Sequence, residues 1–268
     1  CNVEENAVIE SLDLQTIYEV PVRMLGEKLD LTVLRKLSLP AGDEPPLAEW
    51  RTFLHRLKNP KHNVKVGLVG KYVELPDAYK SIAESFIHGG TVNDCHVDVK
   101  YIPSEDITSA NVSEILEGLQ GILVAPGFGS RGIEGKIITA QYARENNVPF
   151  LGICLGMQCA VVEFARNVIH LEGAHSTEID HKTKYPVIDL MEEQKSVTDK
   201  GGTMRLGGYK CVISQDSLAL KAYGKNEIIE RHRHRYEFNN SYMDAFVSHG
   251  MIPAGINPES DLVEIMEI

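Results

Sequence analysis

The sequence lacks the features that would place it in a membrane, outside the cell or on nucleic acid. Its five cysteines include no Cys-x-x-Cys pair and no disulfide-framework spacing, which favours reduced thiols and a cytoplasmic protein. No apolar run approaches the ~18 residues that a membrane-spanning helix needs. With 27 basic against 38 acidic residues, the formal net charge is −11. That charge argues against a nucleic acid or an anionic membrane as the main partner.

No charged-then-apolar leader opens the chain, and its first residue is Cys1 rather than Met. We therefore expect an excerpt of a longer polypeptide. Residues 1–38 carry apolar positions at helical spacing, which predicts short helices whose apolar face packs on another domain. Residues 39–63 contain a Pro- and Gly-rich stretch and then a short amphipathic helix, 47–57, which is typical of an interdomain linker.

From residue 64 onward, strands alternate with helices. The predicted strands are 64–69, 97–102, 121–124 and 148–153, and the predicted helices are 77–88, 112–119, 137–145 and 155–165. Gly89-Gly90 is the expected stop of the first helix. The alternation predicts an α/β fold with a doubly wound, mostly parallel sheet. Beyond residue 169 the alternation weakens, and strands over 185–190, 204–213 and 261–268 predict an antiparallel excursion.

The chain is organised around Gly152-Ile153-Cys154-Leu155-Gly156. It follows a predicted buried strand and opens a predicted helix, so Cys154 lies at a tight strand-to-helix turn of the nucleophile-elbow kind. The helix N-terminus favours the thiolate, and the Leu155 backbone N–H is placed to donate to an oxyanion. A small apolar residue at the end of a core strand is the alternative for Cys154. We favour the nucleophile.

A loop rich in Gly and Pro, 125–132, follows the third predicted strand. It is a candidate for a second oxyanion donor beside Cys154, because both loops leave the carboxyl ends of parallel strands. A phosphate-binding loop is a weaker alternative, since the loop lacks the Gly-Lys-Ser/Thr ending. A flexible loop without a functional role is the third interpretation of these residues.

Residues 231–237 read Arg-His-Arg-His-Arg-Tyr-Glu. As one strand, they would place three arginines on one face and two histidines on the other. Arginines in this arrangement suit a carboxylate or a phosphate, although a solvated basic strand is the simpler interpretation. We predict no metal site, because no cysteine or carboxylate follows His232 and His234 at ligand spacing.

These motifs together resemble the glutaminase domain of the CTP synthase family, a class I glutamine amidotransferase domain with a flavodoxin-like fold. The likeness rests on four stretches: Gly152–Gln158, Gly70-Lys71-Tyr72 with Leu75–Tyr79, Gly201–Gly207 and Glu230–Glu237. The resemblance implies three parts. They are the tail of the amidoligase (synthetase) domain in 1–38, the interdomain linker in 39–63, and the amidotransferase domain in 64–268, truncated at its C-terminus.

The resemblance also implies an activity. Cys154 attacks the side-chain amide of L-glutamine, and the released ammonia serves the ATP-dependent amination of UTP to CTP. Gly127 and Leu155 are the implied oxyanion donors. The implied glutamine-binding residues are Gly127, Leu155, Gly156, Met157, Gln158, Glu178 and Arg235. No cofactor is implied for this domain: ATP and Mg²⁺ belong to the amidoligase domain, GTP acts as an activator, and the full-length family is homotetrameric.

The chain departs from the family at three places. Pro126 precedes Gly127 where many relatives have a second Gly, and His175 stands where relatives have Asn. The family's general base is the His of a His-Pro-Glu motif, and no such motif follows Cys154. We assign none of the ten histidines to that role and expect the missing His and Glu beyond residue 268. A chain with the nucleophile but not the base is expected to be alkylated at Cys154 and to turn over poorly.

Two other functions remain open at this point. One is another class I amidotransferase or a γ-glutamyl hydrolase, against which the Arg-His-Arg-His-Arg stretch and the first 38 residues argue. The other is a non-catalytic module that binds glutamine or a partner domain and keeps Cys154 unused.

Overall fold

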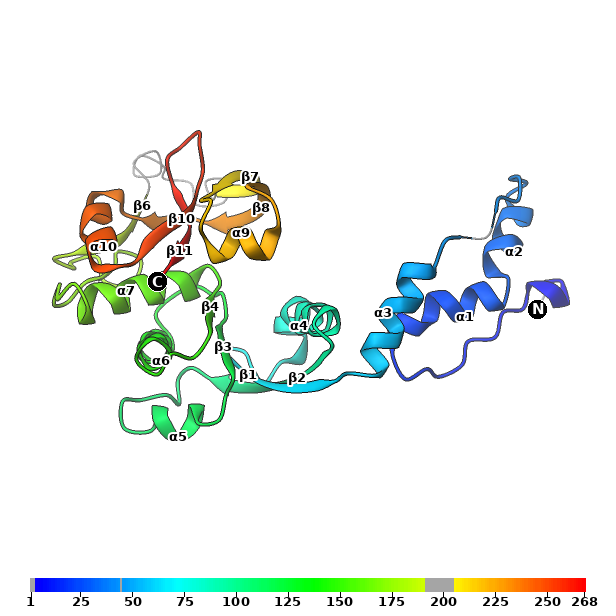
Figure 1. Cartoon of the computed structure of the whole chain (residues 1–268), viewed down its shortest axis with the longest axis horizontal. Coiled ribbons are helices and arrows are strands. Elements are labelled where there is room, and N and C mark those ends of the chain that lie inside the picture. The colour runs from blue at the N-terminus through cyan, green and yellow to red at the C-terminus, as the bar shows by residue number, and fades with distance from the viewer. Residues whose placement is uncertain (1–2, 44, 191–204) are drawn as a thin grey trace. The chain divides into compact units, whose positions relative to one another are not determined.

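The structure is a computed structural model that describes residues 3–43, 45–190 and 205–268. The chain divides into two compact units (Figure 1): residues 1–64 with 81–98, and residues 65–80 with 99–268. The domain boundary at residue 64 that the sequence suggests stays a prediction. In the part of the chain that is described, no helix has both the length and the apolar character needed to cross a membrane.

Part of the third family motif, residues 201–204, and the polar loop expected over 195–202 lie outside the described residues.

The first unit is built from short helices around an aromatic cluster. Its elements are the 3-10 turns η1 (Glu5–Ala7) and η2 (Ile17–Glu19) and the helices α1 (Val20–Gly26), α2 (Leu29–Lys36), α3 (Ala48–Lys58) and most of α4 (Lys80–Val92). Tyr18, Trp50 and Phe53 pack with their ring centroids between 5.3 and 5.9 Å apart. The short helices predicted before residue 39 and the helix predicted over 47–57 are confirmed.

The predicted stop of α4 at Gly89-Gly90 is wrong. The 3-10 turn η3 (Pro76–Tyr79) leads into α4, which runs on through both glycines to Val92. Gly90 serves a close approach instead, because a Cβ there would lie 2.7 Å from the carbonyl oxygen of Cys95. In sequence, a glycine needed for close packing looks the same as a glycine that ends a helix. Only the tertiary contact shows which of the two roles it has.

The main sheet is parallel, as the sequence predicts. Its strands β1 (His62–Gly70), β2 (Cys95–Pro103), β3 (Gly121–Val124) and β4 (Phe150–Gly152) lie in the order β2-β1-β3-β4. The β1–β3 and β3–β4 pairs are parallel, and the helices α5 (Val112–Leu116), α6 (Ile133–Glu145) and α7 (Leu155–Asn167) follow the strands along the chain (Figure 1). The predicted α/β class and doubly wound, mostly parallel sheet are confirmed.

The register of this sheet aligns the strand ends. Val69 lies opposite Val124, and Val124 lies opposite Gly152. The segments that leave β1, β3 and β4 therefore emerge at one edge, which is where parallel sheets bind ligands. Buried apolar side chains hold this edge in place, since Val69 and Val124 are both 0% exposed, and each such side chain contributes about 1.5–3 kcal/mol.

Two smaller sheets follow, which confirms the predicted excursion from the parallel sheet. One has the order β5-β6-β9, with β5 (His175–Ser176), β6 (Pro186–Leu190) and β9 (Tyr236–Phe238). The other has the order β11-β10-β7-β8, with β7 (Arg205–Ile213), β8 (Glu227–His234), β10 (Ile252–Ile256) and β11 (Val263–Glu267). The second is antiparallel throughout. The elements α9 (Leu218–Tyr223), η4 (Asn240–Tyr242) and α10 (Met243–His249) complete this part.

The basic stretch is not one continuous strand. β8 ends at His234, β9 begins at Tyr236, and Arg235 occupies the bend between them. Arg231 and Arg233 are exposed and share one face of β8, while the bend gives Arg235 a different environment. The prediction of three arginines on one face is therefore wrong for Arg235, because the period-two rule ends where the strand ends.

Candidate active site

Cys154 lies at a strained turn between β4 and α7. Its backbone has φ 54° and ψ −107°, a region that L residues rarely adopt, so the conformation costs about 1–3 kcal/mol and the packing around it must impose it. Gly152 and Gly156 permit that packing. A Cβ on Gly156 would lie 2.2 Å from the Val124 carbonyl oxygen, and one on Gly152 would lie 2.5 Å from the carbonyl carbon of Gly156. The nucleophile-elbow geometry predicted from the sequence is present.

The thiol of Cys154 is poised between opposing influences. Burial raises its pKa, and the nearby carboxylates of Glu178 and Glu237 act in the same direction. A hydrogen bond from the Leu155 backbone N–H and the charge of Lys136 lower it, but the net pKa is raised. Burial therefore outweighs the helix end that was expected to favour the thiolate, and a base would be needed to activate the sulfur at neutral pH.

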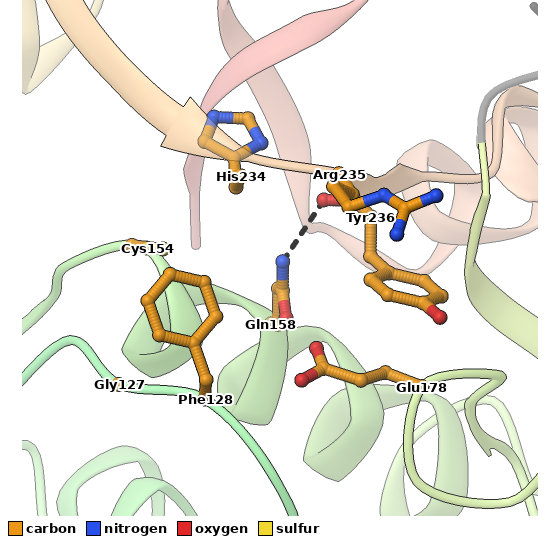
Figure 2. Close-up of a pocket in the computed structure, with 8 residues that line it drawn as sticks. All are labelled: Gly127, Phe128, Cys154, Gln158, Glu178, His234, Arg235 and Tyr236. Carbon is orange, nitrogen blue, oxygen red and sulfur yellow. Dashed lines mark hydrogen bonds between the residues drawn. The ribbon is translucent and has the colours of Figure 1, made fainter. Parts of the chain in front are cut away.

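A cavity of about 200 Å³ opens in front of Cys154. Figure 2 shows the residues around it, which come from the loop after β3, from the start of α7 and from the region of the smaller sheets. Its lining residues are Gly127, Phe128, Cys154, Gln158, Glu178, His234, Arg235 and Tyr236. Five of these were predicted as site residues from the sequence.

The remaining predicted residues lie elsewhere in the elbow. Among the described residues that line the cavity, Leu155, Gly156 and Met157 do not occur. Leu155 acts on Cys154 through its backbone N–H, and Gly156 is buried against β3. The binding roles proposed for these three residues stay predictions.

Two sides of the cavity carry different chemistry. In Figure 2, Cys154, Gly127 and Phe128 lie on one side of Gln158, and Glu178 and Arg235 lie on the other. We call the first group the sheet wall and the second the charged wall. Gln158 is buried on α7 and donates from Nε2 to the carbonyl oxygen of Tyr236 at 3.0 Å, so it ties the two walls together.

A network of buried charges includes His234 and Glu237, which lie near Arg235 in the chain. Arg205 on β7 forms an ion pair with Glu264 on β11, with Nη2–Oε1 2.5 Å and Nη1–Oε2 3.1 Å, and its Nη1 lies 3.6 Å from Oε1 of Glu237. These three side chains are only 4% exposed. His232 and His234 extend the network, with 2.8 Å between Nδ1 of His232 and Nε2 of His234.

His234 lines the cavity but is not available as a general base. Its Nε2 faces His232, and its Nδ1 lies 3.1 Å from Oε1 of Glu237. A base that takes a proton from Cys154 needs one ring nitrogen directed at the sulfur. Both nitrogens of His234 therefore face the buried network, and its Nδ1 has no hydrogen-bond partner among the described residues.

Among the described residues, no other histidine lines the cavity. His175, singled out as a departure from the family, lies on β5, where Nδ1 accepts from the Ser176 N–H and Nε2 lies 3.8 Å from Glu134. The sequence contains one His-x-Glu after Cys154, namely His170-Leu171-Glu172. Both His170 and Glu172 are exposed, and neither is a lining residue of the cavity.

Sequence reasoning missed Phe128, His234 and Tyr236 as lining residues. Phe128 stands in the glycine-rich loop that was flagged, and its side chain is 52% exposed. His234 and Tyr236 flank Arg235 at the bend between β8 and β9. A prediction that the strand breaks at Arg235 would have been needed to place both residues at the cavity. Within the described ranges, no group of three or more His, Cys, Asp or Glu residues could hold a metal ion.

A model of the family "Glutamine amidotransferase class-I" matches residues 74–268. CTP synthases from Cytophaga hutchinsonii and Christiangramia forsetii are 58% and 59% identical to the chain over 268 residues, all of it. The chain spans about half the length of these curated relatives, 50% and 49% respectively.

A solved structure is also similar. It is described as the Trypanosoma brucei CTPS glutaminase domain with bound acivicin, and it is 33% identical with a TM-score of 0.69. The match covers 76% of this chain and 79% of that one.

Proposed function

The chain belongs to the class I glutamine amidotransferase family, and from that premise we propose that it hydrolyses L-glutamine to glutamate and ammonia at Cys154. One observation carries the proposal: a cysteine on a strained elbow shares a cavity of about 200 Å³ with a carboxylate and a guanidinium. A free amino acid offers an ammonium and a carboxylate at one end, and glutamine offers a carbonyl carbon at the other.

The charged wall suits the amino acid end. The Glu178 carboxylate complements the α-ammonium, and the Arg235 guanidinium complements the α-carboxylate, to which it binds bidentately. Gln158 fixes the bend that carries Arg235 through its bond to the Tyr236 carbonyl. A glutamine held in this way extends its side-chain amide toward Cys154.

The sheet wall suits the chemistry. The Cys154 sulfur adds to the amide carbon, and the carbonyl electrons move to oxygen, which accepts hydrogen bonds from the Gly127 and Leu155 N–H groups. When the carbonyl re-forms, the C–N bond breaks and ammonia leaves with an added proton. Water then hydrolyses the thioester to glutamate and regenerates the thiol. The step needs a base that takes the thiol proton from Cys154 and returns it to the leaving nitrogen, and we assign none of the described histidines to it.

The use of the ammonia is a further part of the proposal. Relatives about twice as long are named CTP synthase, which supports delivery of ammonia to an amidoligase domain of the same polypeptide. That domain would carry ATP and Mg²⁺ and would aminate UTP to CTP, with GTP as activator and a homotetramer as the assembly. Residues 1–38 would be its C-terminal tail and residues 39–63 the linker.

Covalent labelling tests the glutamine site. The chain is treated with acivicin, an amino-acid electrophile, and the modified peptide is identified by mass spectrometry. We expect one label on Cys154, suppressed by excess glutamine and absent in Cys154→Ala. Cys159→Ala is the matched control, because Cys159 lies on the same helix and is 2% exposed. Labelling elsewhere, or labelling that glutamine does not suppress, contradicts the proposal.

One observation favours a second candidate, a non-catalytic glutamine-binding module. Burial raises the pKa of Cys154, and no histidine in the described ranges is directed at it. A module of that kind would bind glutamine but would resist acivicin, so the same experiment separates the two.

A further inference from the structure

Two buried lysines hold the loop that leaves β3. Lys136 on α6 is 0% exposed and donates from Nζ to the Ala125 carbonyl at 2.6 Å. Lys71, just after β1, is 7% exposed and donates from Nζ to the carbonyls of Phe128 and, at 2.8 Å, of Gly129. Burying an ammonium is costly, and the reaction scheme above uses neither lysine. Their shared target suggests a role in shaping the loop.

The peptide between Phe128 and Gly129 is held from both sides. Its carbonyl accepts from Lys71, and its N–H donates to Oε1 of Glu178 at 3.0 Å. The carbonyl and the N–H of a planar trans peptide point in opposite directions, so an ammonium on one side and a carboxylate on the other fix its rotation. A flip of this peptide would break two charge-assisted hydrogen bonds.

Gly127 lies between the two anchored ends. A Cβ added there would lie 3.8 Å from Nζ of Lys136 and 3.9 Å from Cδ of Lys71, so both lysines pass directly beneath this residue. Pro126 has no N–H, so Gly127 carries the first donor after the Lys136 anchor. Within the part of the chain that the structure describes, the Gly127 N–H donates to no other group, and Gly127 lines the cavity together with Cys154.

We propose that Lys71 and Lys136 are positioning residues for the oxyanion site: by holding loop 125–129 at both ends, they keep the Gly127 N–H directed at the carbonyl that Cys154 attacks. The inference rests on the proposed glutaminase function. Among the described residues that line the cavity, neither lysine occurs, so both would act through the backbone.

Glu178 couples this loop to the substrate. Its Oε1 accepts from Gly129, and Oε2 is the oxygen left for the α-ammonium of glutamine. Substrate occupancy and loop orientation therefore depend on one carboxylate. Loss of Lys71 is expected to impair the chemical step more than binding, because the loop loses its anchor while Glu178 and Arg235 remain.

The test uses the complete polypeptide and glutamine-dependent ammonia release, with kcat and KM measured separately. Lys71→Met is compared with Lys65→Met, a matched control that removes an exposed ammonium from the preceding strand β1. We expect Lys71→Met to lower kcat about 100-fold, as expected for a misdirected oxyanion donor, with KM changed less than about threefold. Lys136→Met is expected to act in the same direction, and Lys65→Met should match the parent protein.

Lys71→Arg keeps the positive charge but changes the geometry of the side chain, so it should recover part of the kcat that Lys71→Met loses. Its partial activity would also show that substitution at this position does not prevent folding. Equal kcat for Lys71→Met and Lys65→Met overturns the proposal, and so does a rise in KM with kcat preserved. If the parent protein releases no ammonia from glutamine, the proposed function fails and this inference falls with it. If the parent protein releases ammonia and the lysine variants do so equally well, the proposed role of the lysines is contradicted and the proposed glutaminase function stands.

Discussion

The sheet wall and the charged wall of the cavity are held by different physics. On the sheet wall, Cys154 is fixed by apolar strands and by backbone contacts that only glycine allows, such as Gly156 against Val124. Beside the charged wall, Arg235 follows His234, whose Nδ1 lies 3.1 Å from Glu237 of the buried network with Arg205 and Glu264. The wall that makes and breaks bonds is thus held by close packing, while a network of buried charges adjoins the wall that recognises charge.

The contrast has a physical reason. A nucleophile needs one strained backbone geometry, which close-packed surroundings impose without solvent screening. An arginine that binds a carboxylate needs orientation and charge, and buried ion pairs provide specific geometry at a cost in desolvation. The two walls should therefore respond differently to substitution.

The largest effect is expected when the buried network is broken. Glu264→Ala leaves Arg205 without its closest partner at 4% exposure, which should lower the free energy of unfolding by about 3–5 kcal/mol. Lys210→Ala is the control, because it breaks the exposed Lys210–Glu227 pair between β7 and β8 of the same sheet and should cost less than about 1 kcal/mol. Urea unfolding of both variants measures the difference, and equal costs would remove the contrast between the walls.

A similar but somewhat smaller loss is expected on the sheet wall. Gly156→Ala places a Cβ 2.2 Å from the Val124 carbonyl oxygen, so backbone must move, and about 3 kcal/mol of stability should be lost. Gly89→Ala is the matched control in helix α4, since nothing lies within 4 Å of its added Cβ. It should stabilise the chain by up to about 1 kcal/mol. A tolerated Gly156→Ala would mean that packing does not set the elbow.

The third effect concerns recognition rather than stability. Arg235→Ala should raise the glutamine concentration that protects Cys154 from acivicin by about 10- to 100-fold, the effect of losing a charged hydrogen-bond partner worth about 1.5–3 kcal/mol. Arg233→Ala, from the exposed face of β8, should leave protection unchanged. If glutamine protects Cys154 in both variants at the same concentration as in the parent protein, the charged wall does not bind the amino acid.

The smallest effect is a pH profile. Because burial raises the pKa of the Cys154 thiol, its reaction with iodoacetamide should rise about tenfold per pH unit from pH 7 to 9, since only the thiolate reacts. Cys154→Ala supplies the background rate. A rate that levels off near pH 7 would show that the thiolate is stabilised, and it would contradict the raised pKa of the Cys154 thiol.

The elbow at Cys154 could be predicted from local sequence signals, and the bend at Arg235 could not. Alternating strands and helices and the Gly-x-Cys-x-Gly pattern are local signals, and they located β4, Cys154 and α7 within a few residues. At Arg235 the chain passes from β8, which pairs with β7, to β9, which pairs with β6. Both partner strands are distant in sequence, so no local periodicity reveals the bend.

The burial of lysines could not be predicted from local sequence either. Lys136 lies just before the predicted helix 137–145, and nothing in its sequence context distinguishes it from a solvent-exposed lysine. Its burial lowers its pKa to about 8, a property that exists only once α6 packs on the loop after β3. Likewise, Gly90 acts as a packing residue because β2 approaches it, and in sequence it resembles a helix stop.

The most direct test of the central claim is the fate of glutamine at Cys154. The complete polypeptide is mixed with glutamine, quenched in acid, and digested for mass spectrometry, while ammonia release is followed in parallel. We predict a γ-glutamyl adduct on the peptide that contains Cys154, with ammonia release lost in Cys154→Ala and retained in Cys159→Ala. Ammonia release that survives in Cys154→Ala would contradict the account.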